Sequence, residues 1–143
     1  MGLLEGAAAA GRAGEDVRTV GGRRVRMWTD DRVDDAGGGD IDRARSVAAA
    51  RGRFARNAVI QGAAAELFKV WAVTVRARAA RLGARIVLCL HDELLVHVPA
   101  EQGGEAAELV VAALDEAAHR WSPHRDVRFV ADVCIVKRWS DVD

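Results

Sequence analysis

The chain has 143 residues, half of them hydrophobic, which is enough for a domain with a core of its own. Lys plus Arg and Asp plus Glu both number 21, so the net charge neither indicates nor excludes a nucleic-acid partner. The sequence has no uninterrupted run of about 18 apolar residues and no basic signal-peptide region at its start, so we expect a cytoplasmic protein with no membrane partner.

The N-terminal part predicts a helix, a turn and a loop. Leu3–Ala13 is Ala-rich and predicts a short helix. Val17–Trp28 predicts two short extended pieces around a Gly-Gly pair, with Arg23 and Arg24 just past the turn. Thr29–Asp42 is acidic, Gly-rich and without periodicity, which predicts a mobile loop.

A long helical pattern follows, from about Ala44 to Leu82, and we expect a break near Gly52. Gly83 is a natural stop after the last turn. Seven apolar residues recur at spacings of three and four and predict a single buried stripe: Ile60, Ala64, Leu67, Trp71, Val75, Ala79 and Leu82.

Two apolar runs of strand length, Ile86–Leu90 and Leu94–Val98, flank the polar residues His91, Asp92 and Glu93. Three polar residues between such runs predict a tight β-hairpin. Asp92 and Glu93 would then be adjacent carboxylates on a stiff support, able to hold a hard cation such as Mg²⁺. The triplet alone also fits a plain polar turn, which is its more common use.

The C-terminal part predicts a helix at about Gln102–Trp121, opened by Pro99, and a last strand at Val127–Val136. Since hairpins pair antiparallel, the order helix, hairpin, helix, strand predicts an α+β fold with helices on one face of a small sheet. Cys89 and Cys134 both lie in apolar runs, which favours buried, unpaired thiols.

Arg53, Asn57 and Gln61 are spaced four residues apart, so they share a face if the helix runs through them. Amide side chains both donate and accept hydrogen bonds, which suits the acceptor-rich minor groove of a duplex. On spacing alone, an alternative is that Asn57 caps the helix and Gln61 is a solvated surface residue.

The two groups, in this order and separation, resemble DNA polymerase family A, the bacterial polymerase I type. Arg53–Glu66, R-F-A-R-N-A-V-I-Q-G-A-A-A-E, resembles the family's N-x-x-I-Q-G-x-A-A-[DE] helix. Leu88–Val98, L-C-L-H-D-E-L-L-V-H-V, resembles its motif C hairpin. Two weaker matches keep the order: Thr19–Arg24 resembles a T-x-x-G-R-R turn, and the closing K-R-W-S-D resembles a C-terminal W-D pattern.

The resemblance covers most of the chain from about Val17 and implies a partial polymerase palm, an antiparallel sheet built on the motif C hairpin. The chain is similar to the C-terminal piece of bacterial bifunctional 3'–5' exonuclease/DNA polymerases. It implies an N-terminal helix and G-R-R turn segment at 1–28, a flexible loop and helix lead-in at 29–50, and the palm at 51–143.

The implied function is that of a DNA-directed DNA polymerase, a nucleotidyltransferase of DNA replication and repair. Its implied partners are double-stranded template–primer DNA and, in the complete enzyme, dNTP. The resemblance implies catalytic roles for Asp92, Glu93 and His91: Asp92 and Glu93 match metal-binding acids that hold Mg²⁺ in a complete site, and His91 matches a residue near the primer terminus. The implied DNA-binding residues are Arg53, Asn57, Gln61, Arg23 and Arg24, the last two through phosphate contact or a structural salt bridge.

The 143 residues of the sequence lack the family's D-Y-S-x-x-E aspartate and its R-x-x-x-K-x-x-x-F-G fingers helix, and they include no tyrosine. Two-metal nucleotidyl transfer needs carboxylates from more than one place in a fold, so we expect the chain alone not to polymerise. Three interpretations stay open: a polymerase fragment, one half of a split enzyme that needs a partner chain, and a non-catalytic duplex-binding module.

Overall fold

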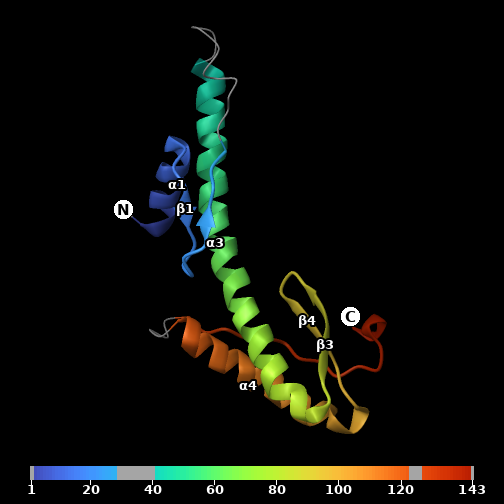
Figure 1. Cartoon of the computed structure of the whole chain (residues 1–143). Helices are drawn as coiled ribbons and strands as arrows, with labels where there is room; N and C mark the ends of the chain where they lie inside the picture. The colour runs from blue at the N-terminus through green and yellow to red at the C-terminus, as the bar shows by residue number, and fades with distance from the viewer. Residues whose placement is uncertain (1, 29–40, 123–126, 143) are drawn as a thin grey trace. The chain divides into compact units, whose positions relative to one another are not determined.

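The computed structural model describes residues 2–28, 41–122 and 127–142 (Figure 1). The chain forms two compact units, Met1–Glu66 and Leu67–Asp143. Most of the predicted loop Thr29–Asp42 lies outside the described residues. Its last two residues were predicted wrongly, because Ile41 and Asp42 already begin a helix.

The first unit contains a helix, a small antiparallel pair of strands and the N-terminal part of a long helix (Figure 1). Helix α1 spans Leu3–Ala13, which confirms the predicted helix. Strands β1 (Val17–Arg18) and β2 (Arg24–Val25) pair antiparallel, which confirms the two extended pieces around the Gly-Gly turn. The long helix α3 spans Ile41–Ala79.

Glycine lets α1 and α3 approach closely within this unit. A Cβ at Gly11 would lie 2.5 Å from Ala55 Cβ and 2.6 Å from the Arg51 carbonyl oxygen. A Cβ at Gly52 would lie 3.0 Å from the Ala8 carbonyl oxygen. The predicted break near Gly52 is therefore wrong: the helix continues, and its missing side chain makes room for α1.

The buried stripe of α3 agrees with the prediction only in the second unit. There Leu67, Trp71 and Val75 are buried as predicted, as are the last two residues of the stripe. Ile60, by contrast, is 49 % exposed. The core of the first unit uses a different set of residues: Ala7, Val17, Met27, Ala55 and Val59. One continuous stripe was the wrong expectation, because the helix contributes to two separate cores.

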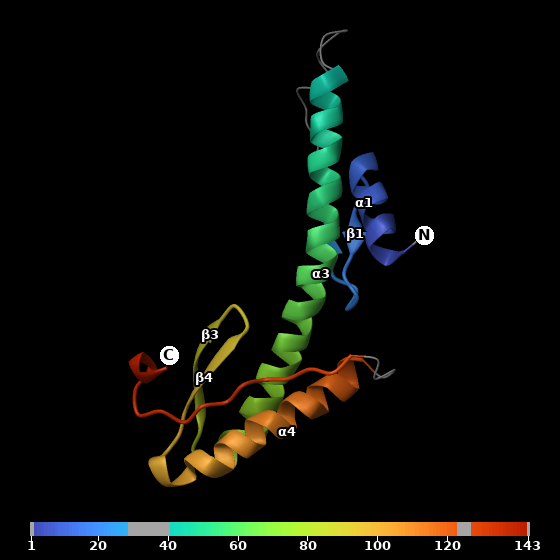
Figure 2. The same cartoon turned by 180° about the vertical axis from the view of Figure 1, so that it is seen from behind.

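In the second unit, the C-terminal part of α3 packs against α4, which spans Gly103–Trp121 and confirms the predicted helix (Figure 2). The indole Nε1 of Trp71 donates a hydrogen bond of 3.0 Å to the buried carbonyl oxygen of Val110. Helix α3 ends through the 3-10 turn η1 (Ala80–Leu82), and Gly83 follows it with φ 67°, as the predicted stop.

The hairpin consists of β3 (Arg85–Leu90) and β4 (Glu93–His97), paired antiparallel. Its connection is tighter than predicted, because Glu93 belongs to β4 and pairs with Leu90. The half-buried side chains of Ile86, Leu94 and Val96 pack against the core of α3 and α4. Helices and small antiparallel sheets confirm the α+β fold class.

The predicted last strand at Val127–Val136 is wrong, since no residue of that range forms a ladder. The segment runs as irregular backbone to the 3-10 turn η3 (Trp139–Asp141) (Figure 2). Phe129 and Ala131 pack on the core, whereas Val130 is 69 % exposed. Part of this apolar segment therefore packs on the core of the second unit, although the segment pairs with no strand among the residues described.

The predicted burial of the cysteines is wrong as well. Cys89 and Cys134 are both exposed and both free. Cys89 lies on β3, and Cys134 lies in the irregular C-terminal segment. An apolar neighbourhood in the sequence therefore did not mean burial for either cysteine.

Helix α3 and its final turn, Ile41–Leu82, contain an 18-residue window of mean hydropathy 1.3, long and apolar enough to cross a membrane. The sequence predicted no span because its uninterrupted apolar runs are shorter. A single helix of this kind is weak support for a span, since core helices of soluble proteins meet the same criterion, and 33 % of this window is buried within the chain. The absence of a membrane partner stays a prediction.

Candidate nucleic-acid interface

Helix α3 runs without a break through Arg53, Asn57 and Gln61. The three side chains therefore share one helix face, and all three are exposed. The predicted polar face required a helix that runs through all three residues, and α3 does so. Asn57 is not a helix cap, because it lies in the helix interior. Contact of these residues with a duplex stays a prediction.

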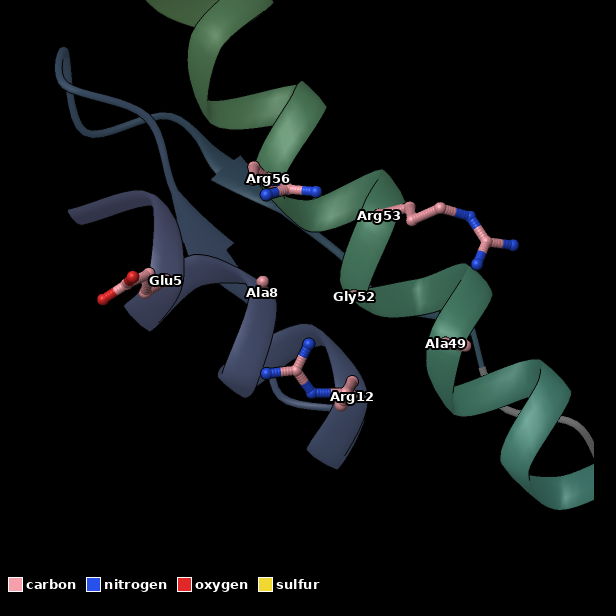
Figure 3. Close-up of a pocket in the computed structure, with 7 residues that line it drawn as sticks. All are labelled: Glu5, Ala8, Arg12, Ala49, Gly52, Arg53 and Arg56. Carbon is pink, nitrogen blue, oxygen red and sulfur yellow. The ribbon is translucent and has the colours of Figure 1, made fainter. Parts of the chain in front are cut away.

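A cationic groove of about 510 Å³ lies between α1 and α3 in the first unit (Figure 3). Arg12 of α1 and Arg53 and Arg56 of α3 supply its positive charge. Small residues and one carboxylate complete its lining: Glu5, Ala8, Ala49 and Gly52. Arg53 belongs both to this groove and to the polar face of α3, so the two features adjoin.

Guanidinium groups suit phosphate oxygens, which they bind through paired donors. The sequence analysis missed Arg12 and Arg56 as candidates. Arg56 follows Arg53 by three residues, a spacing visible in the sequence, but Arg12 lies on another element and joins them only through the fold.

The Thr19–Arg24 turn is docked on the end of the α3 motif. The Thr19 hydroxyl and the Gly21 N–H both donate to the carboxylate of Glu66, the latter at 2.9 Å. The Nε of Arg23 lies 3.7 Å from Glu66 Oε1. Two motifs that are far apart in the sequence therefore contact each other in the structure. Glu66, the last residue of the N-x-x-I-Q-G-x-A-A-[DE] pattern, was not among the residues predicted from the sequence.

The other arginine of the turn is also paired. Arg24 Nε donates to Asp16 Oδ2 at 2.5 Å, and Asp16 Oδ1 accepts the Met27 N–H at 2.9 Å. The hydrogen bond from Met27, followed by that from Arg24, lowers the pKa of Asp16. Both arginines therefore form ion pairs, which is the structural alternative considered for them, and their contact with phosphate stays a prediction.

His91, Asp92 and Glu93 lie at the tip of the β3–β4 hairpin, and all three are exposed. His91 has a φ of 52°, in the left-handed region that tight hairpin turns require. Carboxylate oxygens are the ligands that Mg²⁺ prefers. Within residues 2–28, 41–122 and 127–142, no group of three His, Cys, Asp or Glu side chains could hold a metal ion. The two acids thus fit part of a Mg²⁺ site.

The two candidate groups belong to different units. Arg23, Arg24, Arg53, Asn57 and Gln61 all lie in the first unit, and the hairpin tip lies in the second. Helix α3 carries Arg53, Asn57 and Gln61 on one face. Arg23 lies against the same helix at Gly62, whereas Arg24 pairs with Asp16. The combination of these residues with the hairpin tip into one site stays a prediction.

Four similarities to known proteins bear on these groups. Residues 4–141 match the sequence profile of DNA polymerase family A. The chain is 41 % identical over 75 residues to a thermostable DNA polymerase I of Thermus filiformis, covering 52 % of this chain and 9 % of that protein. It is 34 % identical over 113 residues to a thermostable DNA polymerase I of Thermus thermophilus, covering 78 % and 12 %.

The fold is similar to the POL domain of Pol1 from M. smegmatis, solved in complex with DNA primer-template and dNTP. The TM-score is 0.60 at 32 % sequence identity, over 80 % of this chain and 19 % of that one. The chain therefore spans only a small part of the proteins that it resembles.

Proposed function

Because the chain belongs to DNA polymerase family A, we propose that it forms the C-terminal part of a polymerase palm and binds template–primer DNA. The unbroken helix α3 carries this proposal, since it presents Arg53, Asn57 and Gln61 on one exposed face. The related M. smegmatis domain, whose structure holds DNA primer-template and dNTP, supports the same partners for the complete enzyme.

The chemistry of this face suits a duplex of any sequence. Minor-groove acceptors are nearly the same for every base pair, so Asn57 and Gln61 would check the shape of the duplex without reading its sequence. Arg53 would link this contact to the cationic groove, whose arginines suit the phosphates of the DNA backbone.

At the hairpin tip, we propose that Asp92 and Glu93 supply carboxylates of a two-metal site and that His91 lies near the primer terminus. Mg²⁺ ions, when bound in a complete site, stabilise the charge that develops on the attacking and leaving oxygens of nucleotide addition. Since the D-Y-S-x-x-E motif and the fingers helix are absent from these 143 residues, the chain alone would lack activity.

The hairpin favours a second candidate, in which the chain is one half of a split polymerase. β3 and β4 form a two-stranded sheet, with no third strand beside them among the residues described. Val87 and Leu90 of β3 are 58 % and 43 % exposed. A partner chain that carries the missing aspartate strand could pair with this open edge and cover both side chains.

Duplex binding tests the proposed function directly. We expect the full chain to bind fluorescently labelled template–primer DNA, with an affinity that falls steeply with salt. Gln61→Ala should weaken binding by about 1 kcal/mol, a factor of about five, on every sequence tested. Gln102→Ala, at the chain's other glutamine, is the matched control. Equal affinity of Gln61→Ala and wild type would overturn the minor-groove contact.

A further inference from the structure

The carboxylate of Glu66 has three partners on a turn far away in the sequence. Both oxygens are used: Oε1 accepts from the Thr19 hydroxyl and faces Arg23 Nε, and Oε2 accepts from the Gly21 N–H. The side chain of Glu66 is only 15 % exposed, whereas that of Arg23 is 52 % exposed. The buried end of this contact is therefore the acid, and the arginine projects toward solvent.

Thr19 joins this contact to the backbone of the turn. It is buried, and its hydroxyl oxygen accepts the Arg23 N–H at 3.0 Å. The Thr19 N–H in turn donates to the Arg23 carbonyl oxygen at 3.0 Å. Thr19 therefore transmits the position of the Glu66 carboxylate to the backbone of Arg23.

The turn is seated on α3 at Gly62, the residue after Gln61. A Cβ at Gly62 would lie 2.3 Å from Thr19 Cγ2 and 3.3 Å from Arg23 Nη2. The absence of that side chain brings the guanidinium of Arg23 against the helix, one residue from the polar face. Arg23 Nε faces Glu66, and a guanidinium has further donors with which to reach a phosphate.

We propose that Glu66 is a positioning residue that holds Arg23 against α3 at Gly62, the residue after Gln61, so that the turn and helix α3 contact the DNA backbone and minor groove as one surface. This inference rests on the proposed function. It assigns Arg23 a phosphate contact and Glu66 a role that operates only through Arg23 and Thr19.

The sign of one affinity change separates this role from simple electrostatics. Glu66→Gln removes a negative charge beside the DNA-binding face, and electrostatics alone predicts equal or tighter binding. Positioning predicts binding about tenfold weaker, because Arg23 is released from its place. Glu15→Gln removes the same charge at an exposed residue outside the Thr19–Arg24 turn, and should bind at least as tightly as wild type.

A double-mutant cycle tests whether Glu66 works through Arg23. The full chain is titrated with labelled duplex DNA that has a recessed 3' end, at several salt concentrations. Arg23→Ala should weaken binding about tenfold and lower the salt slope by about one. Adding Glu66→Gln to Arg23→Ala should then cost nothing further, whereas independent losses that add would overturn the proposal.

A second variant covers the case in which Glu66→Gln fails to fold, judged by its circular dichroism. Thr19→Val keeps the shape of the side chain and removes the hydroxyl, so it should weaken binding severalfold; wild-type affinity would overturn the proposal. If the wild type itself does not bind duplex DNA, the proposed function falls, and this inference with it. If Gln61→Ala weakens binding and Glu66→Gln does not, the inference alone is overturned.

Discussion

The guanidinium of Arg78 on α3 meets the carboxylate of Glu116 on α4 at two points, Nε to Oε2 at 3.1 Å and Nη2 to Oε1 at 3.0 Å. Arg120, on the next turn of α4, donates to the same Oε1 at 2.6 Å. The hydrogen bond from Arg78 is the main reason that the pKa of Glu116 is lowered. The ion pair between these two helices therefore depends on the charge of Glu116, and it lies beside the apolar contacts that they share.

This dependence predicts a loss of stability in acid. Because the pKa of Glu116 is lower in the folded chain, its contribution is complete above the ordinary value of 4.5 and disappears as the pH falls through the folded-state pKa. Melting temperatures measured from neutral pH to about pH 3 should show a weaker acid dependence for Glu116→Gln than for wild type. Glu108→Gln, at an exposed acid on the same helix, is the control, and identical profiles for wild type and Glu116→Gln would contradict the prediction.

The approach of α1 to α3 predicts opposite effects for two glycines of one helix. Gly11→Ala would place a Cβ 2.5 Å from Ala55 Cβ and 2.6 Å from a backbone carbonyl oxygen, so we expect a loss of about 1–3 kcal/mol. At Gly6 nothing lies within 4 Å of the added Cβ, so Gly6→Ala should stabilise by about 0.5–1 kcal/mol. Urea unfolding of both variants measures the difference, and equal effects would show that the helices do not approach at Gly11.

Local patterns predicted the parts of this fold that local chemistry decides. The Ala-rich α1, the period of α4 and the two apolar runs of the hairpin needed no distant partner to be recognised. Gly52 misled the prediction because a glycine that admits another helix looks, in sequence, like a helix breaker. Val127–Val136 misled it because strand propensity does not reveal whether a partner strand is present.

The same difference between local patterns and distant contacts applies to the candidate site. The spacing of Arg53, Asn57 and Gln61 was readable because one helix carries all three. The contacts of Glu66 with the Thr19–Arg24 turn were not readable, since 45 to 47 residues separate the hydrogen-bonded partners. Motif order indicated that both segments matter, and only the fold shows that they touch.

The core of the second unit predicts a difference between two tryptophans. Trp71 is buried and donates its indole N–H to the Val110 carbonyl oxygen at 3.0 Å. Trp71→Phe removes that donor and leaves a buried carbonyl without it, which should cost about 1–3 kcal/mol. Trp139→Phe, at a residue 52 % exposed, should change the stability by less than about 0.5 kcal/mol. Thermal unfolding followed by circular dichroism measures both.

The hairpin tip predicts the outcome of a primer-extension assay. The full chain, supplied with template–primer DNA, Mg²⁺ and dNTPs, should extend no primer, because Asp92 and Glu93 are not joined by a third acid among the residues described. Losing preorganised charge of this kind costs orders of magnitude in rate. The assay is run beside Asp92→Ala and, separately, with an added chain that carries the D-Y-S-x-x-E motif and the fingers helix.

Extension that appears only with the added chain, and that Asp92→Ala abolishes, would establish the split-enzyme interpretation and the role of Asp92 together. Extension by the chain alone that Asp92→Ala abolishes would mean that another acid of this chain replaces the missing aspartate, and the prediction of inactivity would be wrong. Duplex binding without extension in either mixture would favour the non-catalytic module, because the contact proposed for the exposed face of α3 requires no metal.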